Sequence, residues 1–517
     1  MSSTYFDVLI IGAGLSGIGA ACHLSQSCPN KTFTVLERRR AIGGTWDLFR
    51  YPGVRSDSDM LTFGYQFRPW QSLNVLADGT SIRNYISDTA KAYGIDKKIN
   101  FGLKVQAANW SSQKKHWTVL ALDEETGEKS QYECAFLITG TGYYNYDAGY
   151  LPNFKGIDEF KGLCIHPQKW PADLDYTGKK IVVIGSGATA VTLVPAMAEK
   201  AAHVTMLQRS PSYVFSMSAY DAVSAALRKI LPDPWVYSFA RKRNIVLQRV
   251  MFKMTKRWPN FMRRFFIARA QKHLGKDFDI SHFSPRYKPW DERLCAVPDA
   301  DLFKVLKSGE ASIVTDQIES FTATGLRLMS GQELEADIIV TATGLDIQLL
   351  GGIDLKVDEA TPVLSELLTY KGAMIQNIPN MVFMFGYTNA TWTLKADLSA
   401  SYACRLLNYM KQNNATVAVA RDEQGCALDT TVMSSLGSGY IDRASELLPR
   451  QGSKHPWIVL DDYKADRDIC LIVQSMMASL ILRNQSVLAV VFIGSQRLYI
   501  MALIGAELHA NIGSKRD

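Results

Sequence analysis

Two glycine-rich loops, each directly after a short apolar run, constrain the fold of this chain most strongly. The first is GAGLSG at 12–17 after the apolar run 7–11, and the second is GSGATA at 185–190 after the run 180–184. A buried parallel strand, a GxGxxG or GxGxxA turn and a following helix form the βαβ unit that binds dinucleotides. Two such units predict an α/β protein with two Rossmann-like dinucleotide-binding domains, and therefore two bound nucleotides.

The surroundings of the first loop support nucleotide binding. A helix is expected from residue 18, and the next strand, 33–36, ends in Glu37, twenty residues after Gly17. The first two glycines let the backbone approach a pyrophosphate, the third lets the helix pack on the strand, and the acid accepts hydrogen bonds from ribose hydroxyls. The candidate contacts in this unit are Gly12, Gly14, Ser16, Gly17 and Glu37.

The second loop is followed by a strand, 203–207, that ends in Gln-Arg-Ser and has no acid. A carboxylate at this place would repel a 2′-phosphate, whereas a guanidinium pairs with it in bidentate fashion. This favours NADPH over NADH, and the alternative is that Arg209 is only a solvated charge at a strand end. The candidate contacts are Gly185, Ser186, Gly187, Ala188, Thr189, Ala190, Val191, Arg209 and Ser210.

A strongly basic segment interrupts this pattern. Between 228 and 276 the chain carries fourteen Lys and Arg against one acid, Asp233, while the whole chain has a net charge of +7. Three helices are expected, at 223–230, 236–258 and 261–274. We favour a helical insertion with a solvated face, with contact to anionic lipid as the alternative. No nucleic-acid module accompanies the charge, so we expect no nucleic-acid partner.

The remaining composition is that of a globular protein, with 47% hydrophobic and 21% charged residues. The eight cysteines are scattered without a CxxC pair, which argues against a disulfide framework and predicts no metal site. We expect a cytoplasmic protein, with peripheral contact to the inner face of the cell membrane, through the basic insertion or the apolar tail, as the alternative. The uncharged runs in this tail are shorter than the ~20 residues of a spanning helix, so a buried helix or interfacial attachment is favoured over a membrane span. A shifted reading frame in the source sequence is the other alternative.

Two segments, 136–142 and 337–344, look like crossings between the domains, so one domain is expected to be discontinuous. The predicted layout is a first domain in two parts (1–145 and 346–465), a second domain in two parts (146–214 and 286–345), a basic helical insertion (215–285) and an atypical apolar tail (466–517).

Three further motifs carry a family resemblance. They are GGTWDLFRYPGVRSD at 43–57, FKGLCIHPQKWP at 160–171, which has the form FxGxxxHxxxWP, and KPWDERLC at 288–295. The chain resembles the Baeyer–Villiger monooxygenases over about residues 6–463, most strongly a mycobacterial subgroup of FAD-containing members. This implies an FAD domain, an NADPH domain, and insertion of one oxygen atom of O2 beside a ketone carbonyl to give an ester or lactone. Small hydrophobic ketones or sulfur compounds are the implied substrates.

The resemblance also assigns residues. Its implied contacts are Gly44, Thr45, Trp46, Asp47, Leu48, Asp57 and Val105 to FAD, Arg55, Ser56 and Asp57 to NADP, and Phe160, Gly162, His166, Trp170 and Pro171 as the fingerprint.

The implied catalytic pair is Arg293, with Asp57 as the carboxylate that positions it. A guanidinium stays protonated when desolvated and so stabilises negative charge beside the flavin. Some relatives carry a lysine before this arginine where this chain has Glu292, which leaves the NADPH preference mainly to Arg209 and Ser210. For His166 a structural role in linking the domains is favoured over proton transfer.

Three alternatives remain open at this point. The first is a flavin-containing oxygenase of nitrogen or sulfur atoms. The second is a pyridine-nucleotide disulfide reductase, against which the missing redox cysteine pair argues. The third is a membrane-surface flavoprotein that oxidises NADPH without oxygenating a product.

Overall fold

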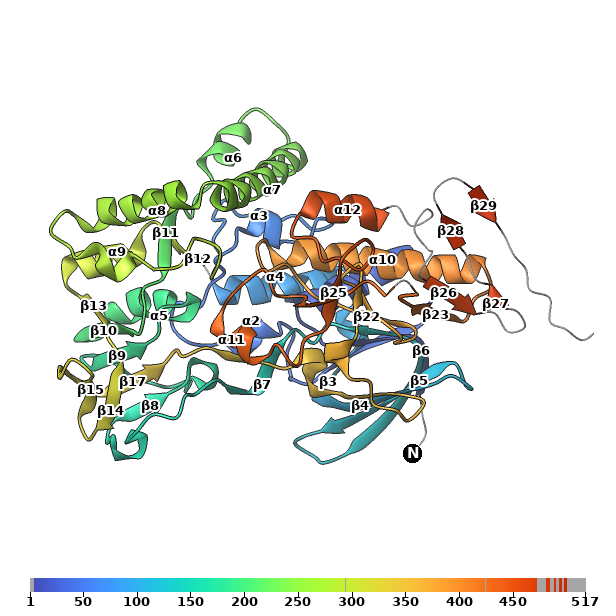
Figure 1. The fold of residues 1–517 in the computed structure, drawn as a ribbon, viewed down its shortest axis with the longest axis horizontal. Coiled ribbons are helices and arrows are strands. Elements are labelled where there is room, and N and C mark those ends of the chain that lie inside the picture. Colours follow the sequence, from blue (N-terminus) through green and yellow to red (C-terminus); the bar gives the residue numbers. More distant parts are fainter. Residues whose placement is uncertain are drawn as a thin grey trace, which may run out of the picture.

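The computed structural model describes residues 4–292, 294–423 and 425–471, together with the backbone of four short strands between 480 and 499. These residues form two lobes, each built on its own sheet, with a ridge of helices along one edge (Figure 1). The fold therefore places two nucleotide-binding loops in separate sheets, as the sequence predicts.

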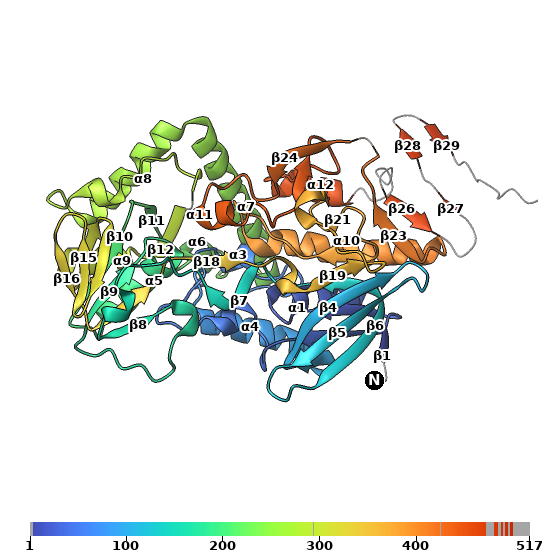
Figure 2. The same ribbon diagram turned by 60° about the horizontal axis from the view of Figure 1, so that its bottom comes forward.

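The first lobe is built on an eight-stranded sheet of order β19-β4-β5-β6-β1-β2-β3, to which β22 adds beside β6. Strands β6, β1, β2 and β3 are parallel, and β4 and β5 form an antiparallel extension that comes forward in Figure 2. The strands are β1 (Thr4–Ile11), β2 (Phe33–Glu37), β3 (Ile99–Phe101), β4 (Leu103–Ser111), β5 (His116–Asp123), β6 (Lys129–Thr139), β19 (Asp354–Val357) and β22 (Met381–Phe383).

Successive residues of β1 enter different cores, as expected for a parallel strand buried on both faces. Val8 and Ile10 pack with the helices, whereas Leu9 and Ile11 pack with Trp110 and other residues on the opposite face. The helices on the first face are α1 (Leu15–Ser27), α4 (Gly79–Ala92) and α10 (Trp392–Gln412), and two short helices, α2 (Thr45–Leu48) and α3 (Met60–Phe63), precede α4.

The second lobe is built on an all-parallel sheet of order β13-β10-β9-β17-β8. Helices α5 (Ala188–Ala198) and α9 (Asp301–Ser308) pack on one face, and a three-stranded antiparallel sheet packs on the other. The strands are β8 (Leu163–Ile165), β9 (Lys180–Ile184), β10 (His203–Gln208), β13 (Ala311–Thr315) and β17 (Ile338–Thr341), covered by β14 (Ile318–Thr322), β15 (Gly325–Leu328) and β16 (Glu333–Glu335).

Two antiparallel strands, β7 (Tyr144–Gly149) and β18 (Leu345–Ile347), carry the chain between the lobes and back. They follow directly on the two segments that the sequence identified as crossings. The first lobe is thus closed by residues after 353, which supply β19, β22 and α10.

The basic segment forms three helices, α6 (Ala222–Leu227), α7 (Asp233–Arg257) and α8 (Pro259–Leu274). They lie along the upper edge in Figure 1, and β11 (Tyr213–Met217) and β12 (Leu294–Pro298) pair in parallel beneath them. The predicted helical insertion is present, within a few residues of the expected helix limits.

The C-terminal part adds β23 (Val417–Ala420), β24 (Ala427–Thr431), β25 (Arg450–Gly452), α11 (Gly439–Arg443) and α12 (Tyr463–Leu471). The apolar tail begins within α12, and where its backbone is described between 480 and 499 it forms short strands, of which β26 (Leu480–Arg483) pairs with β23. The segments described between 480 and 499 are therefore strands and not the buried helix expected there, and the other residues after 471 lie outside the described part of the chain. Within the described residues, no helix is both long and apolar enough to cross a membrane.

Candidate functional site

A cavity of about 1240 Å³, counting the part open to solvent, lies against the first glycine loop. Of the predicted FAD contacts, those that line it are Gly12, Gly14, Ser16, Glu37, Gly44, Thr45, Trp46 and Val105. Those that do not line it are Gly17, Asp47, Leu48 and Asp57.

Close backbone packing explains why the loop needs its glycines. Gly12 has φ of +99°, which strains any residue with a side chain, and a Cβ there would lie 2.6 Å from the Gly140 carbonyl oxygen. A Cβ on Gly17 would lie 1.8 Å from the Gly12 carbonyl oxygen, so this residue seats α1 and does not face the cavity. Gly14 lies at the N-terminus of α1, where unpaired N–H groups favour an anion.

Glu37, at the end of β2, is almost fully buried at the cavity wall. Its two carboxylate oxygens accept hydrogen bonds from the backbone N–H groups of Ala13, at 2.6 Å, and Arg39, at 2.8 Å. Burial raises the pKa of this carboxyl, and the two N–H donors oppose that shift. The carboxylate therefore holds the glycine loop in shape and keeps lone pairs available to ribose hydroxyls.

Aromatic rings surround another part of the cavity. Trp46 meets Phe63 edge to face, and Tyr143 stacks on Trp392 with ring centroids 5.2 Å apart. The Trp392 indole N–H donates to the Ser16 hydroxyl at 2.8 Å, which ties α10 to the glycine loop. These surfaces suit a flat ring system.

Several residues of this lining were not predicted as site residues. They are Phe63, Tyr143, Tyr144, Tyr146, Gln348, Leu350 and Trp392. The tyrosines lie in the run GYYNYD at 142–147 and Trp392 in GYTNATWTLKADL at 386–398, both outside the three motifs from which site residues were assigned.

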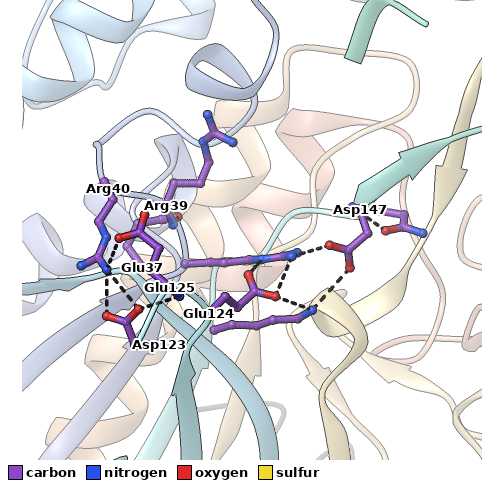
Figure 3. A network of polar contacts seen from close by, with 10 residues as sticks. Glu37, Arg39, Arg40, Asp123, Glu124, Glu125 and Asp147 are labelled. Atoms are coloured by element: carbon purple, nitrogen blue, oxygen red, sulfur yellow. Dashed lines mark hydrogen bonds and ion pairs between the residues drawn. The ribbon is translucent and has the colours of Figure 1, made fainter. Parts of the chain in front are cut away.

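A network of charged side chains flanks the cavity near Glu37 (Figure 3). Arg38 pairs with Glu124, at 2.6 Å from Nε, and with Asp147. Lys104 pairs with the same two carboxylates at 3.1 and 3.5 Å. Arg38 and Lys104 also line the cavity, so the network joins β2, β4 and β7 across this end of it.

The 43–57 segment connects the cavity to the second lobe. The buried Tyr51 hydrogen-bonds to threonines of α5, and a Cβ on Gly53 would lie 2.4 Å from the Thr192 carbonyl oxygen. Arg55 pairs with Asp301 at the start of α9, at 2.7 Å, and burial lowers the pKa of the Arg55 guanidinium. The segment thus lines the cavity of the first lobe with Gly44–Trp46, and its second half packs on the second lobe.

Two predicted FAD contacts of this segment have partners within the protein. Asp47 is buried beneath Arg39, at 2.7 Å, and Arg50. Leu48 packs in the apolar core of the second lobe. Asp57 is exposed, and its carboxylate accepts a hydrogen bond from the Ser58 hydroxyl at 3.4 Å.

The second glycine loop precedes α5 in the same geometry as the first. The predicted residues 185–191 run from the end of β9 into the first turn of α5, where free N–H groups face outward. A Cβ on Gly187 would meet nothing within 4 Å, so the space over the loop is open. The Ser186 hydroxyl pairs with that of Ser212 at 2.8 Å.

Arg209 and Ser210 follow β10 directly and are exposed beside this loop. Burial raises the pKa of Glu292, and the positive charge of Arg209 opposes that shift, which places the two side chains near each other. The residue in which this chain departs from the family pattern therefore lies within electrostatic range of the guanidinium predicted to read the 2′-phosphate.

His166 lies between the lobes. Its Nε2–H donates to the Gly344 carbonyl at 3.1 Å, and its Nδ1 accepts from the Gln168 N–H at 3.2 Å. A Cβ on Gly149 would lie 1.9 Å from the imidazole, so the ring packs directly on β7. Burial lowers the pKa of His166, which keeps it neutral. This position favours the linking role over proton transfer.

The other fingerprint residues support the same region. Phe160 packs against Phe321 beneath the second sheet, and a Cβ on Gly162 would lie 2.4 Å from the Asp337 carbonyl oxygen. Trp170 packs on the core of the second lobe, while Pro171 is exposed. Arg293, the predicted catalytic arginine, lies outside the described residues.

A sequence model of the flavin-binding monooxygenase-like family matches residues 6–349. The chain belongs to this family. It is 60% identical over 471 residues to the protein MymA of Mycobacterium tuberculosis, covering 90% of this chain and 95% of that one. It is 50% identical over 464 residues to the FAD-containing monooxygenase EthA of Mycolicibacterium smegmatis, covering 89% and 94%.

Solved structures with the same fold support the two-domain architecture. A steroid monooxygenase bound to NADP superposes with a TM-score of 0.75 at 20% identity, and the OTEMO enzyme in complex with FAD and NADP with 0.72 at 21%. Both matches cover 93% of this chain and the whole of the other. The prediction of a flavin monooxygenase with two dinucleotide-binding domains is confirmed.

Proposed function

We propose that this chain is an FAD- and NADPH-dependent Baeyer–Villiger monooxygenase that inserts one oxygen atom of O2 beside the carbonyl of a small hydrophobic ketone. The observation that carries the proposal is the 43–57 segment. It lines the aromatic cavity at Gly44–Trp46 and packs on α5, the helix of the second nucleotide loop, at Tyr51 and Gly53. We call this contact between the two lobes the seam, and two bound cofactors would meet there.

The residues present fit FAD in the first cavity. The N-terminus of α1 would hold the pyrophosphate, Glu37 the ribose, and Trp46 and Phe63 would lie beside the ring system. When bound, a flavin can accept a hydride from NADPH and can then activate O2.

In the second lobe, the N-terminus of α5 would hold the NADPH pyrophosphate, while Arg209 and Ser210 would bind the 2′-phosphate. Arg55, Ser56 and Asp57 would lie on the side of the nicotinamide, because they continue the segment that packs on α5.

Arg293 would supply the fixed positive charge beside the reacting oxygen, and Asp57 would orient it. Both roles rest on the match of residues 288–295 and 43–57 to the family motifs. Relatives of the fold solved with a lactone, such as cyclohexanone monooxygenase with ε-caprolactone, support carbonyl oxygenation as the reaction. A sulfide or thioamide is the other substrate class that the family resemblance supports.

The decisive experiment combines product analysis with Arg293→Ala. With a panel of ketones and NADPH, the unchanged enzyme should give esters or lactones carrying one oxygen from ¹⁸O2. Arg293→Ala should still oxidise NADPH but lose ester formation by roughly 10²–10³-fold, the effect of removing a group that stabilises developing negative charge. Normal ester yield from the variant would refute its role, and sulfoxide without ester would place the chain among the heteroatom oxygenases.

The nucleotide preference has its own test. Arg209→Ala should raise KM for NADPH by at least about tenfold and leave KM for NADH nearly unchanged, because only the 2′-phosphate is lost as a partner. Glu292→Gln is the opposite perturbation: it removes a negative charge near Arg209 and should lower KM for NADPH. Equal changes for both nucleotides in Arg209→Ala would contradict the assignment.

A further inference from the structure

The outer surface of helices α6 to α8 is unusually apolar. Among the described residues, twenty large hydrophobic side chains are exposed, and eleven of them lie within 222–274, a tenth of the chain. We call these eleven residues, together with the exposed basic residues among them, the ridge surface. The eleven are Val223, Ile230, Leu231, Trp235, Phe239, Val246, Leu247, Val250, Trp258, Phe261 and Phe265.

Helix α7 carries apolar residues on its exposed side and polar residues on its inner side, the reverse of an ordinary surface helix. Trp235, Phe239, Val246 and Val250 are spaced by four, seven and four residues, which places them on one outer stripe of the helix. Trp235 is 70% exposed and Phe239 50%. A helix that met only water on this stripe would carry polar residues there.

The inner stripe of α7 is polar because it packs on α3. The buried Arg241 donates to the carbonyls of Leu61, at 2.7 Å, and Gly64, at 2.9 Å. Gln248 donates to Asp59 at 2.8 Å. These hydrogen bonds determine which side of α7 faces inward. The apolar stripe lies on the opposite side of the helix and is therefore exposed.

Helix α8 follows the same plan on its outer side. Trp258, just before the helix, and Phe261 and Phe265 are exposed, at 53%, 60% and 44%. The buried residues recur every four positions on the opposite side and are Met262, Phe266, Ala270 and Leu274. Both helices run along one edge of the molecule, away from the two sheets (Figure 1).

Exposed basic residues lie among the apolar ones. Lys242 falls on the apolar stripe of α7, and Arg264 and Arg269 are exposed on α8. No ion pair involving these three is found within the part of the chain that the structure describes, whereas Arg243 and Arg249 on the flanks of α7 are paired with carboxylates. The ridge surface thus combines unpaired cations with protruding aromatic rings.

We propose that the ridge surface docks on the surface of an anionic lipid bilayer, with its aromatic side chains at the depth of the headgroups. Tryptophan and phenylalanine on one side of a helix, interleaved with Lys and Arg, match the chemistry of that interface. The complementary charge is that of acidic phospholipids. A protruding edge with two helices suits a broad surface better than a pocketed partner. The proposal is independent of the reaction catalysed.

The test is co-sedimentation of the full-length, FAD-loaded chain with vesicles of phosphatidylglycerol and phosphatidylcholine in equal parts, and with vesicles of phosphatidylcholine alone. The apolar variant is Trp235→Ser with Phe239→Ser, and the basic variant is Lys242→Gln with Arg264→Gln and Arg269→Gln. The matched control is Met329→Ser with Val363→Ser, which removes apolar side chains that are 65% and 56% exposed outside the ridge surface.

The unchanged chain and the control variant should sediment with the anionic vesicles and not with the neutral ones. The apolar variant should lose at least about tenfold in partition coefficient. The basic variant should lose on the order of a hundredfold, about fivefold for each charge, and added salt should mimic it. Thermal unfolding and NADPH oxidation in solution should be the same for all four proteins, because no altered residue lines the cavity.

Three outcomes would overturn the proposal. The first is that the unchanged chain stays in solution with anionic vesicles, and the second is that both ridge variants sediment as strongly as the control. The third is concentration-dependent self-association that the ridge variants abolish, without vesicle binding, which would identify the surface as a contact between copies of this chain.

Discussion

The contact between Gly53 and α5 gives a sharp prediction about how the two lobes are held together. Gly53 has φ of +76°, and an alanine Cβ would lie 2.4 Å from the Thr192 carbonyl oxygen and 2.7 Å from the Ala196 Cβ. Because ordinary contact begins near 3.4 Å, α5 would have to retreat by about 1 Å. The left-handed backbone costs an alanine roughly 1–2 kcal/mol, and overpacking typically costs about 1–3 kcal/mol.

Gly53→Ala should therefore destabilise the chain by about 2–5 kcal/mol if the contact is kept. If the contact opens instead, the loss in stability is smaller, but the second nucleotide loop moves relative to the cavity. In that case NADPH should reduce the flavin at least about tenfold more slowly, since a displacement of 1 Å impairs the geometry of transfer. Urea unfolding and stopped-flow flavin reduction measure the two quantities on the same protein.

Gly178→Ala is the matched control. Gly178 has φ of +68°, close to that of Gly53, but a Cβ there meets nothing within 4 Å. This variant should show only the backbone cost of roughly 1–2 kcal/mol and an unchanged rate of flavin reduction. If Gly53→Ala behaved like Gly178→Ala in both assays, the inference that this loop couples the lobes would be wrong.

Three other predictions use local chemistry. Glu37→Gln should weaken FAD binding by roughly ten- to hundredfold, measured by titrating apoprotein, because a charge-assisted hydrogen bond contributes about 1.5–3 kcal/mol. Asp466→Ala should cost about 3–5 kcal/mol in urea unfolding, since it leaves Lys395, 2.7 Å away, charged and buried. Burial lowers the folded-state pKa of His166, so stability is lost as pH falls through about 6.5, the pKa in the unfolded chain. His166→Gln should therefore show a shallower fall in melting temperature between pH 7 and 5.5.

The nucleotide loops were predictable because their signal is steric and local. A glycine at position 17 is required because a Cβ would collide with the carbonyl oxygen of Gly12, five residues away. The apolar run 180–184 became β9 with the expected limits, since strand, turn and helix follow one another in sequence. Patterns of this kind depend on neighbours in the chain, so a single sequence contains them.

Contacts between distant segments could not be predicted in this way. The Trp392 indole reaches the Ser16 hydroxyl across 376 residues, and Arg55 finds Asp301 across the seam. Neither residue type specifies its partner, because tryptophan and arginine bond to many groups equally well. The polar inner stripe of α7 is a similar case, since Arg241 faces inward only because the carbonyls at the end of α3 lie there.

Two motifs of the family resemblance have a common physical role in the structure. The 43–57 segment leaves the first lobe and packs on α5. The fingerprint places His166 on the backbone of Gly149, at the end of β7, and of Gly344, just before β18, and these two strands carry the chain between the lobes. The two motifs therefore contact the seam from opposite sides. Because transfer between two cofactors depends steeply on their separation, a change in a residue that sets the distance between the lobes would slow the reaction, as a change in a cofactor-binding residue would. A role in holding the two lobes at a fixed distance accounts for the glycines, the aromatic rings and the neutral histidine of these two motifs.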